Sequence, residues 1–278
     1  MELIDTHQHL IWRDRLGYGW TAGIPALAEG DFLPETFRAE THGLGVTGAL
    51  FMETGVDDAD YQAEARHVAT RIGTQGLIGQ IASCRPEEDA GFDAWLDECA
   101  DLKVHGFRRI LHVMPDDLSR SETFRTNLRK IGRRGLTFDL CVLARQLPIA
   151  AELVRACPDQ PFVLDHCGVP DIAGNAFAAW ADGIDALAQL PQVNVKLSGI
   201  TAYCAPGGIS REGLQPWVDH ILDRFGPDRI VWGSDWPVVL LGSGLREWIG
   251  LTGELLAGLS EDERARIGHR NARRLYRI

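Results

Sequence analysis

Residues 3–9 read Leu3-Ile4-Asp5-Thr6-His7-Gln8-His9, a short apolar run that becomes polar toward its end. Further runs of similar length, rich in Val, Ile, Leu and Phe, follow at fairly regular intervals: 46–54, 76–83, 104–111, 136–142, 162–166, 193–198 and 229–234. Several of them lack the alternation of apolar and polar residues that a half-exposed strand shows. We therefore predict parallel strands that are covered on both faces.

Segments with the spacing of amphipathic helices separate many of these strands. They cover 57–71, 92–102, 121–131, 175–190, 211–225, 244–256 and 260–276. Ser121 and Ser260 each stand where a helix begins, and Glu263 completes the capping-box pattern of the last one. Strand and helix alternating eight times over 278 residues predict a single-domain α/β protein, a (β/α)8 TIM barrel over 1–278. A doubly wound open sheet is the competing arrangement.

The composition indicates a soluble globular protein, with 45% hydrophobic and 24% charged residues. A net charge of -11 repels nucleic acid and anionic membranes, so we expect neither as a partner. No apolar run approaches the roughly 20 residues of a membrane helix, and no signal-peptide pattern is present. The six cysteines have no metal-binding or redox spacing. We expect a cytoplasmic protein with reduced thiols.

Polar residues gather where three of the predicted strands end. His7 and His9 are two residues apart and therefore point to the same face of the first strand. His166 ends the sixth strand, and Asp235 follows the eighth. Each has a structural interpretation, as a chance pair, a core histidine or a helix cap. Four titratable groups at the end of a barrel where catalytic residues lie nevertheless predict an active site.

Other polar and aromatic residues near the same end are candidates for substrate binding, although ion pairing or packing explains them equally well. They are Arg108, Lys196, Glu53, His112, Trp20 and Trp236. The irregular stretch 10–33 follows the first strand, and a long loop at that position commonly forms part of the site.

These residues resemble those of the amidohydrolase superfamily, in particular its amidohydrolase-2 group. The resemblance rests on the His-x-His of the first strand, His166, Gly233-Ser234-Asp235-Trp236-Pro237 and the stretch 269–276. The stretches 31–35, 145–148 and 195–199 extend it over nearly the whole chain, and the most similar members are sugar-lactone and pyrone-lactone hydrolases. The resemblance implies hydrolysis of a small-molecule lactone, with a sugar lactone favoured. Asp235 would activate water, and His7, His9 and His166 would polarise the carbonyl.

The chain departs from the binuclear members of that superfamily. The stretch 104–112 lacks their bridging lysine or glutamate, and 136–142 lacks their histidine. His7, His9, His166 and Asp235 are still enough for one divalent metal, zinc or manganese. The lactonases that the chain resembles include members without any metal. We expect that no metal is required, with one divalent ion as the alternative.

Two other functions stay open at this point. A metal-dependent decarboxylase would use the same barrel and the same groups, but the missing histidine of the fifth strand counts against it. A non-catalytic binding barrel is the second, and the cluster of four titratable groups counts against that. The sequence has no phosphate-binding glycine loop in a nucleotide-binding context, so we expect no nucleotide cofactor.

Overall fold

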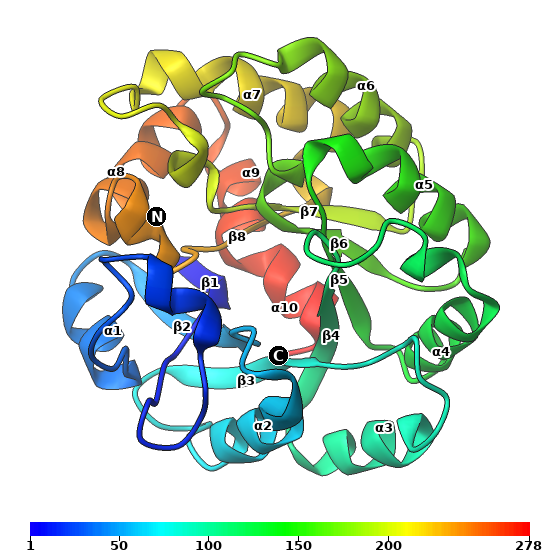
Figure 1. Ribbon diagram of the computed structural model, residues 1–278. Helices are drawn as coiled ribbons and strands as arrows, with labels where there is room; N and C mark the ends of the chain where they lie inside the picture. The colour runs from blue at the N-terminus through cyan, green and yellow to red at the C-terminus, as the bar shows by residue number, and fades with distance from the viewer.

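The computed structural model describes residues 1–278, and its strands stand side by side in chain order around a nearly closed barrel (Figure 1). Their bounds are Leu3–Gln8 (β1), Val46–Met52 (β2), Leu77–Ser83 (β3), Val104–Ile110 (β4), Thr137–Cys141 (β5), Phe162–Leu164 (β6), Val193–Leu197 (β7) and Ile230–Trp232 (β8). All neighbouring pairs from β1–β2 to β7–β8 are parallel. The predicted (β/α)8 barrel is confirmed.

Helices form a ring around the strands and bury their apolar stripes against them (Figure 1). They are Pro34–Glu40 (α1), Tyr61–Ala69 (α2), Phe92–Asp101 (α3), Glu122–Arg133 (α4), Leu147–Ala156 (α5), Phe177–Ala188 (α6), Arg211–Phe225 (α7) and Leu245–Leu255 (α8). The sequence patterns did not predict α1 and α5. The α1 helix has seven residues and buries only Pro34 and Phe37, too few for a periodic stripe. Pro148 lies in the first turn of α5, the one part of a helix that tolerates it.

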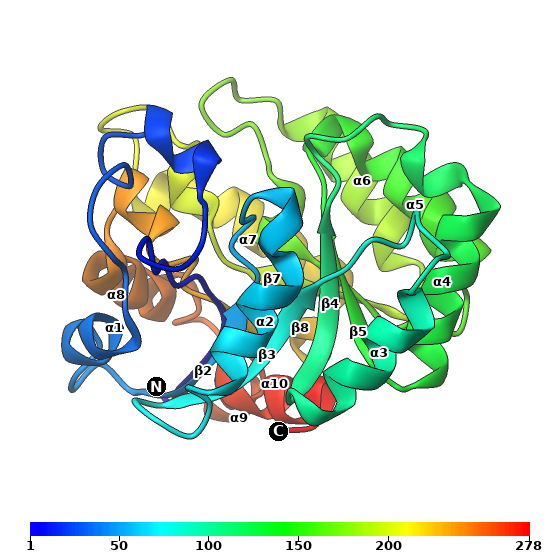
Figure 2. The same ribbon diagram turned by 60° about the horizontal axis from the view of Figure 1, so that its bottom comes forward.

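The predicted last helix is interrupted. It consists of Glu261–Ala265 (α9), a π-helical turn at Arg266–Arg270 and Asn271–Tyr276 (α10). These helices lie across the bottom of the barrel in Figure 2, opposite the long loop that follows β1. The predicted caps are confirmed, because the hydroxyls of Ser121 and Ser260 accept from backbone N–H groups within their helices. All six cysteines are free thiols, and none of the helices combines the length and the hydropathy needed to span a membrane.

Every strand except β3 ends one or two residues earlier than predicted, and His166, which was predicted to end its strand, therefore lies in a loop. The β6 strand ends at Leu164 and β8 at Trp232, so His166 and Asp235 lie just beyond the barrel edge. Both have left-handed backbone conformations, with φ of 52° and 59°. Non-glycine residues rarely adopt this conformation, and such residues are concentrated at functional sites.

The seam, the junction at which β1 meets β8, is closed mainly by hydrogen bonds from loops and side chains at the carboxyl ends of the two strands. The fully buried carboxylate of Asp5 accepts from the backbone N–H groups of His7, at 2.9 Å, and Ser234, at 2.8 Å, and from the Ser234 hydroxyl. Above it, the N–H of Asp235 donates to the His7 carbonyl at 2.8 Å. The N–H of His9 donates to the Trp236 carbonyl at 2.7 Å. The seam therefore fixes His7, His9 and Asp235 relative to one another.

Replacement of the seam carboxylate by Asp5→Ala is expected to destabilise the fold by about 3 kcal/mol, since each buried donor left without a partner costs roughly 1–3 kcal/mol. Urea unfolding followed by circular dichroism measures the change. The control is Thr70→Ala, whose exposed hydroxyl bonds only a carbonyl of its own helix. Equal unfolding midpoints for the Asp5 variant and the parent would contradict this account of the seam.

Candidate active site

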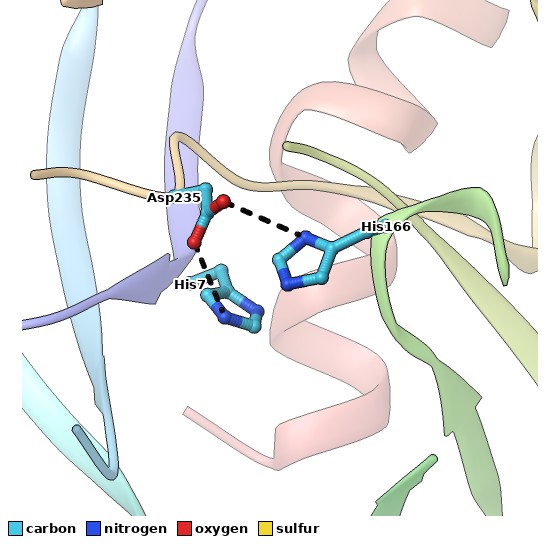
Figure 3. Close-up of side chains that lie close together, drawn as sticks. All are labelled: His7, His166 and Asp235. Atoms are coloured by element: carbon cyan, nitrogen blue, oxygen red, sulfur yellow. Dashed lines mark ion pairs between the residues drawn. The ribbon is translucent and has the colours of Figure 1, made fainter. Parts of the chain in front are cut away.

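The structure brings the four predicted catalytic residues together at the carboxyl end of the barrel, and Figure 3 shows three of them, His7, His166 and Asp235. One oxygen of Asp235 lies 3.7 Å from His7 Nε2 and 3.5 Å from His9 Nε2. Its other oxygen lies 3.9 Å from His166 Nδ1. All four side chains are almost completely buried, so charges here are screened only weakly.

Hydrogen bonds on the far side of each ring set the protonation of His7 and His9. His7 Nδ1 faces a carboxylate oxygen of Asp165 at 3.3 Å, and His9 Nδ1 faces the Met52 carbonyl at 3.0 Å. The Lys196 ammonium also lies 3.3 Å from His7 Nδ1, but Arg108 Nη1, which can only donate, lies 3.2 Å from His7 Nε2. We therefore assign the proton of each ring to Nδ1 and a lone pair to each Nε2. The two Nε2 atoms are 3.2 Å apart and face Asp235. Three acceptor atoms therefore converge on one point with no proton of their own between them.

Burial favours the neutral form of His7 and of His166. It lowers the pKa of His7 well below its ordinary value, even though the nearby Asp165 carboxylate favours the charged ring. Burial also lowers the pKa of His166, against the attraction of Asp235. The Ser198 hydroxyl lies 3.0 Å from His166 Nδ1 and orients that ring. Neutral imidazoles can accept a proton, accept a hydrogen bond or coordinate a metal.

Arg108 of β4 supplies the positive charge nearest to this point. Its Nη1 lies 3.2 Å from His7 Nε2, within reach of the lone pair. Glu53, just beyond β2, holds the guanidinium through a contact of 2.6 Å with Nε, and the Glu53 carbonyl accepts from Nη2 at the same distance. Arg108, a predicted substrate-binding residue, thus reaches the catalytic cluster, and Glu53, another predicted one, positions it.

Lys196 lies beneath the cluster rather than at the mouth. Its fully buried ammonium contacts Asp139 at 2.6 Å, Asp165 at 3.1 Å and the Thr6 carbonyl at 3.1 Å. Burial alone would lower the pKa of Lys196, but these two carboxylates raise it instead. Burial would raise the pKa of Asp165, yet Lys196 and His7 hold it well below its ordinary value. The lysine therefore supports Asp165, which in turn orients His7.

The other predicted substrate-binding residues, Trp20, His112 and Trp236, differ in their burial. Trp20 is 41% exposed at the mouth, and its indole N–H donates to the Thr54 carbonyl at 2.9 Å. His112 is half-buried, with Nδ1 3.3 Å from the Cys141 thiol. Trp236 is fully buried against Phe32 and Phe37, so it packs the loop instead of facing the substrate.

Several residues of the site were not among the predicted ones. Asp139, Asp165 and Ser198 all contact a catalytic histidine or its support. A signal existed for the two aspartates, because a carboxylate inside an apolar strand needs a buried partner. Nothing in the sequence indicated which partner, since Asp139 and Lys196 are 57 residues apart.

The donor set fits one divalent metal. His7, His166 and Asp235 offer ligand atoms that all lie within 4.8 Å of one another, and His9 Nε2 is next to two of them. His7 also has the carboxylate on its far nitrogen that metal-bound histidines commonly have. The bridging lysine or glutamate and the fifth-strand histidine of the binuclear members are absent from this chain, and Asp139, the carboxylate of β5, is paired with the Lys196 ammonium. The chain thus offers one metal position rather than two.

Comparisons with known proteins agree with this geometry. A family model described as amidohydrolase matches residues 4–278. The chain is 30% identical over 298 residues to the L-fucono-1,5-lactonase of Burkholderia multivorans, with 99% of this chain and 96% of that protein covered. It is 27% identical over 283 residues to the L-fucono-1,5-lactonase of Burkholderia ambifaria, covering 99% and 95% respectively.

A solved structure of a similar protein contains a metal. It is an amidohydrolase from Burkholderia multivorans with bound zinc, 27% identical to this chain, and all of both chains is covered. The TM-score of 0.91 indicates that the two barrels share their overall architecture.

Removal of the buried cation by Lys196→Met is expected to destabilise the protein by about 3–5 kcal/mol, because it leaves Asp139 buried without a cation and Asp165 with only Arg108, at 3.4 Å. The unfolding midpoint in urea measures the loss. The double variant Lys196→Met/Asp139→Leu should restore part of the lost stability, since it removes the carboxylate that has no other cation. If Lys196→Met were as stable as the parent, the ion pairs of Lys196 would contribute nothing to the stability of the fold.

Proposed function

This chain belongs to the amidohydrolase family, and on that premise we propose that it hydrolyses a small sugar lactone to the open hydroxy acid. The observation that supports the proposal most is the convergence of His7 Nε2, His9 Nε2 and Asp235 on one buried point. Lactone hydrolysis needs a base for water and a positive or proton-donating group for the carbonyl oxygen. The similarity to L-fucono-1,5-lactonases supports a sugar lactone as the substrate class.

Asp235 acts as the general base in this proposal. Its carboxylate takes a proton from the water that attacks the ring carbonyl, and it later returns that proton to the departing ring oxygen. A positioned base of this kind contributes typically about 10²–10⁴-fold in rate. The backbone N–H of Asp235 donates to the His7 carbonyl, and this bond holds the carboxylate of Asp235 next to β1.

Arg108 stabilises the negative charge that forms on the carbonyl oxygen, because its guanidinium is the hydrogen-bond donor nearest to the point where the histidines and Asp235 converge. Arg108 Nη1 already lies beside His7 Nε2, where that oxygen would be received. Ser198 holds His166 at the other side of Asp235. A divalent metal held by His7, His9, His166 and Asp235 would polarise the carbonyl and lower the pKa of a bound water.

The first expected outcome concerns the base. Asp235→Asn keeps the shape of the side chain but not its basicity, so kcat on an aldonolactone should fall by about 10²–10⁴-fold. Hydrolysis is followed through the colour change of a pH indicator on a panel of such lactones. Asp97→Asn, which alters an exposed carboxylate on α3 outside the site, is the matched control for the loss of one charge. Turnover by the Asp235 variant at the parental rate would exclude the proposed base.

An inactive parent that releases carbon dioxide from an aromatic acid would favour a decarboxylase.

The second expected outcome concerns metal stoichiometry. Protein incubated with zinc and then dialysed is expected to retain one metal ion per chain by elemental analysis, and His166→Ala should retain less. Asp139 is engaged by Lys196, so a second equivalent is not expected. Two retained ions per chain, or none, would contradict the donor set proposed above, whatever the activity of the protein.

A further inference from the structure

A cavity of about 410 Å³ lies between the ends of β2, β3 and β4, next to the catalytic cluster. Glu53 forms part of its wall and also holds Arg108, whose guanidinium lies 3.2 Å from His7 Nε2. The Glu53–Arg108 pair therefore connects the wall of the cavity to the catalytic cluster. Its size is within the usual range for small-ligand pockets, roughly 300–1,000 Å³. The mechanism proposed above uses none of the other residues of its wall.

The charged side chains of the wall balance one another. They are Glu53, Asp58, Arg85 and Arg109, two of each sign. Asp58 contacts Arg85 at 2.7 Å and Arg109 at 3.8 Å, and Glu87 pairs with Arg109 from behind. A wall with balanced charge offers no excess attraction to an anion. It offers hydrogen-bond donors and acceptors together, as hydroxyl groups require.

The two arginines are held in fixed positions. The Arg85 guanidinium stacks on the Tyr61 ring at 4.3 Å and donates to the Ser83 hydroxyl at 2.8 Å. Arg85 is only 6% exposed. Arg109 Nε is buried and has no acceptor, an arrangement that costs free energy unless an oxygen is supplied from outside the protein. An oxygen of a bound ligand would complete it.

Apolar side chains form the rest of the wall. Ile110 is the last residue of β4, and Met114 follows that strand together with Val113, which is 71% exposed although it is a large apolar residue. The C–H faces of a sugar derivative suit such surfaces, and its hydroxyls suit the arginines and carboxylates opposite.

We propose that this cavity binds the uncharged, hydroxyl-bearing chain of the lactone, and that Arg85 and Arg109 determine the specificity for it. The inference rests on the proposed lactone hydrolysis and adds to it the part of the substrate that lies away from the carbonyl. The substrate class is then a neutral polyhydroxylated lactone, and a lactone whose side chain ends in a carboxylate is disfavoured.

Three γ-lactones with the same ring hydroxyls test the proposal. One carries a dihydroxyethyl side chain, one carries none, and one carries a side chain ending in a carboxylate. The parent should show its highest kcat/KM on the dihydroxyethyl lactone. Arg85→Met should reduce the ratio of kcat/KM between the first two lactones by roughly 10–100-fold, the usual effect of losing hydrogen bonds from a charged donor. Arg129→Met, on the outer face of α4, is the control for loss of an arginine.

The exposed Asp58 gives an independent variant that does not depend on the folding of Arg85→Met. Asp58→Asn removes the negative charge shared by both arginines, so the preference should shift toward the carboxylate-bearing lactone. An unchanged ratio in Arg85→Met, or a parental preference for the carboxylate, would overturn the proposal.

Calorimetric binding of the corresponding lactams, which resist hydrolysis, separates this proposal from the proposed function. If the parent hydrolyses no lactone but binds the dihydroxyethyl lactam in an Arg85-dependent way, the cavity assignment stands without the activity. If it hydrolyses all three lactones equally and lactam affinity does not depend on Arg85, the activity stands and the cavity assignment fails.

Discussion

The carboxylate of Asp5 is the constraint on which the catalytic end of the barrel depends. It is fully buried and ties the backbone of β1 to Ser234, just beyond β8. The same seam continues upward through the bond from Asp235 to the His7 carbonyl. The Thr6 hydroxyl also donates to the Trp232 carbonyl of β8 at 2.8 Å. The same contacts that close the barrel between β1 and β8 therefore assemble the active site. Residues more than 220 positions apart in the chain are thereby held within hydrogen-bond distance.

His7 links two layers with opposite electrostatic character. Below it, the Lys196 ammonium and the Asp165 carboxylate form a buried pair that fixes the proton on Nδ1. Above it, Nε2 faces His9 and Asp235, three acceptors whose mutual repulsion has to be relieved by a proton donor or a cation. Arg108 provides part of that relief. The orientation of the His7 ring thus prepares the site to bind positive charge, and the guanidinium of Arg108 is the group that would stabilise a developing oxyanion.

The sequence was sufficient for the eight strands and for the four residues that meet at their ends, because buried strands and polar residues at strand ends leave local patterns. It was insufficient where partners are distant. Lys196 stood out as a cation in an apolar strand, but the pattern could not show that Asp139 and Asp165 neutralise it below the site. Trp236 was predicted at the mouth because of its neighbours in the chain, whereas the aromatic rings of Phe32 and Phe37 bury it. The short α1 helix lacks the periodicity from which helices are predicted.

The most direct test of the central claim is to hydrolyse a neutral aldonolactone in water labelled with heavy oxygen and to examine the product by mass spectrometry. If water activated at Asp235 attacks the ring carbonyl, the label enters the carboxyl group of the product acid. Label found on the released hydroxyl instead, or no acid formed from any such lactone, would contradict the assignment of this site to lactone hydrolysis.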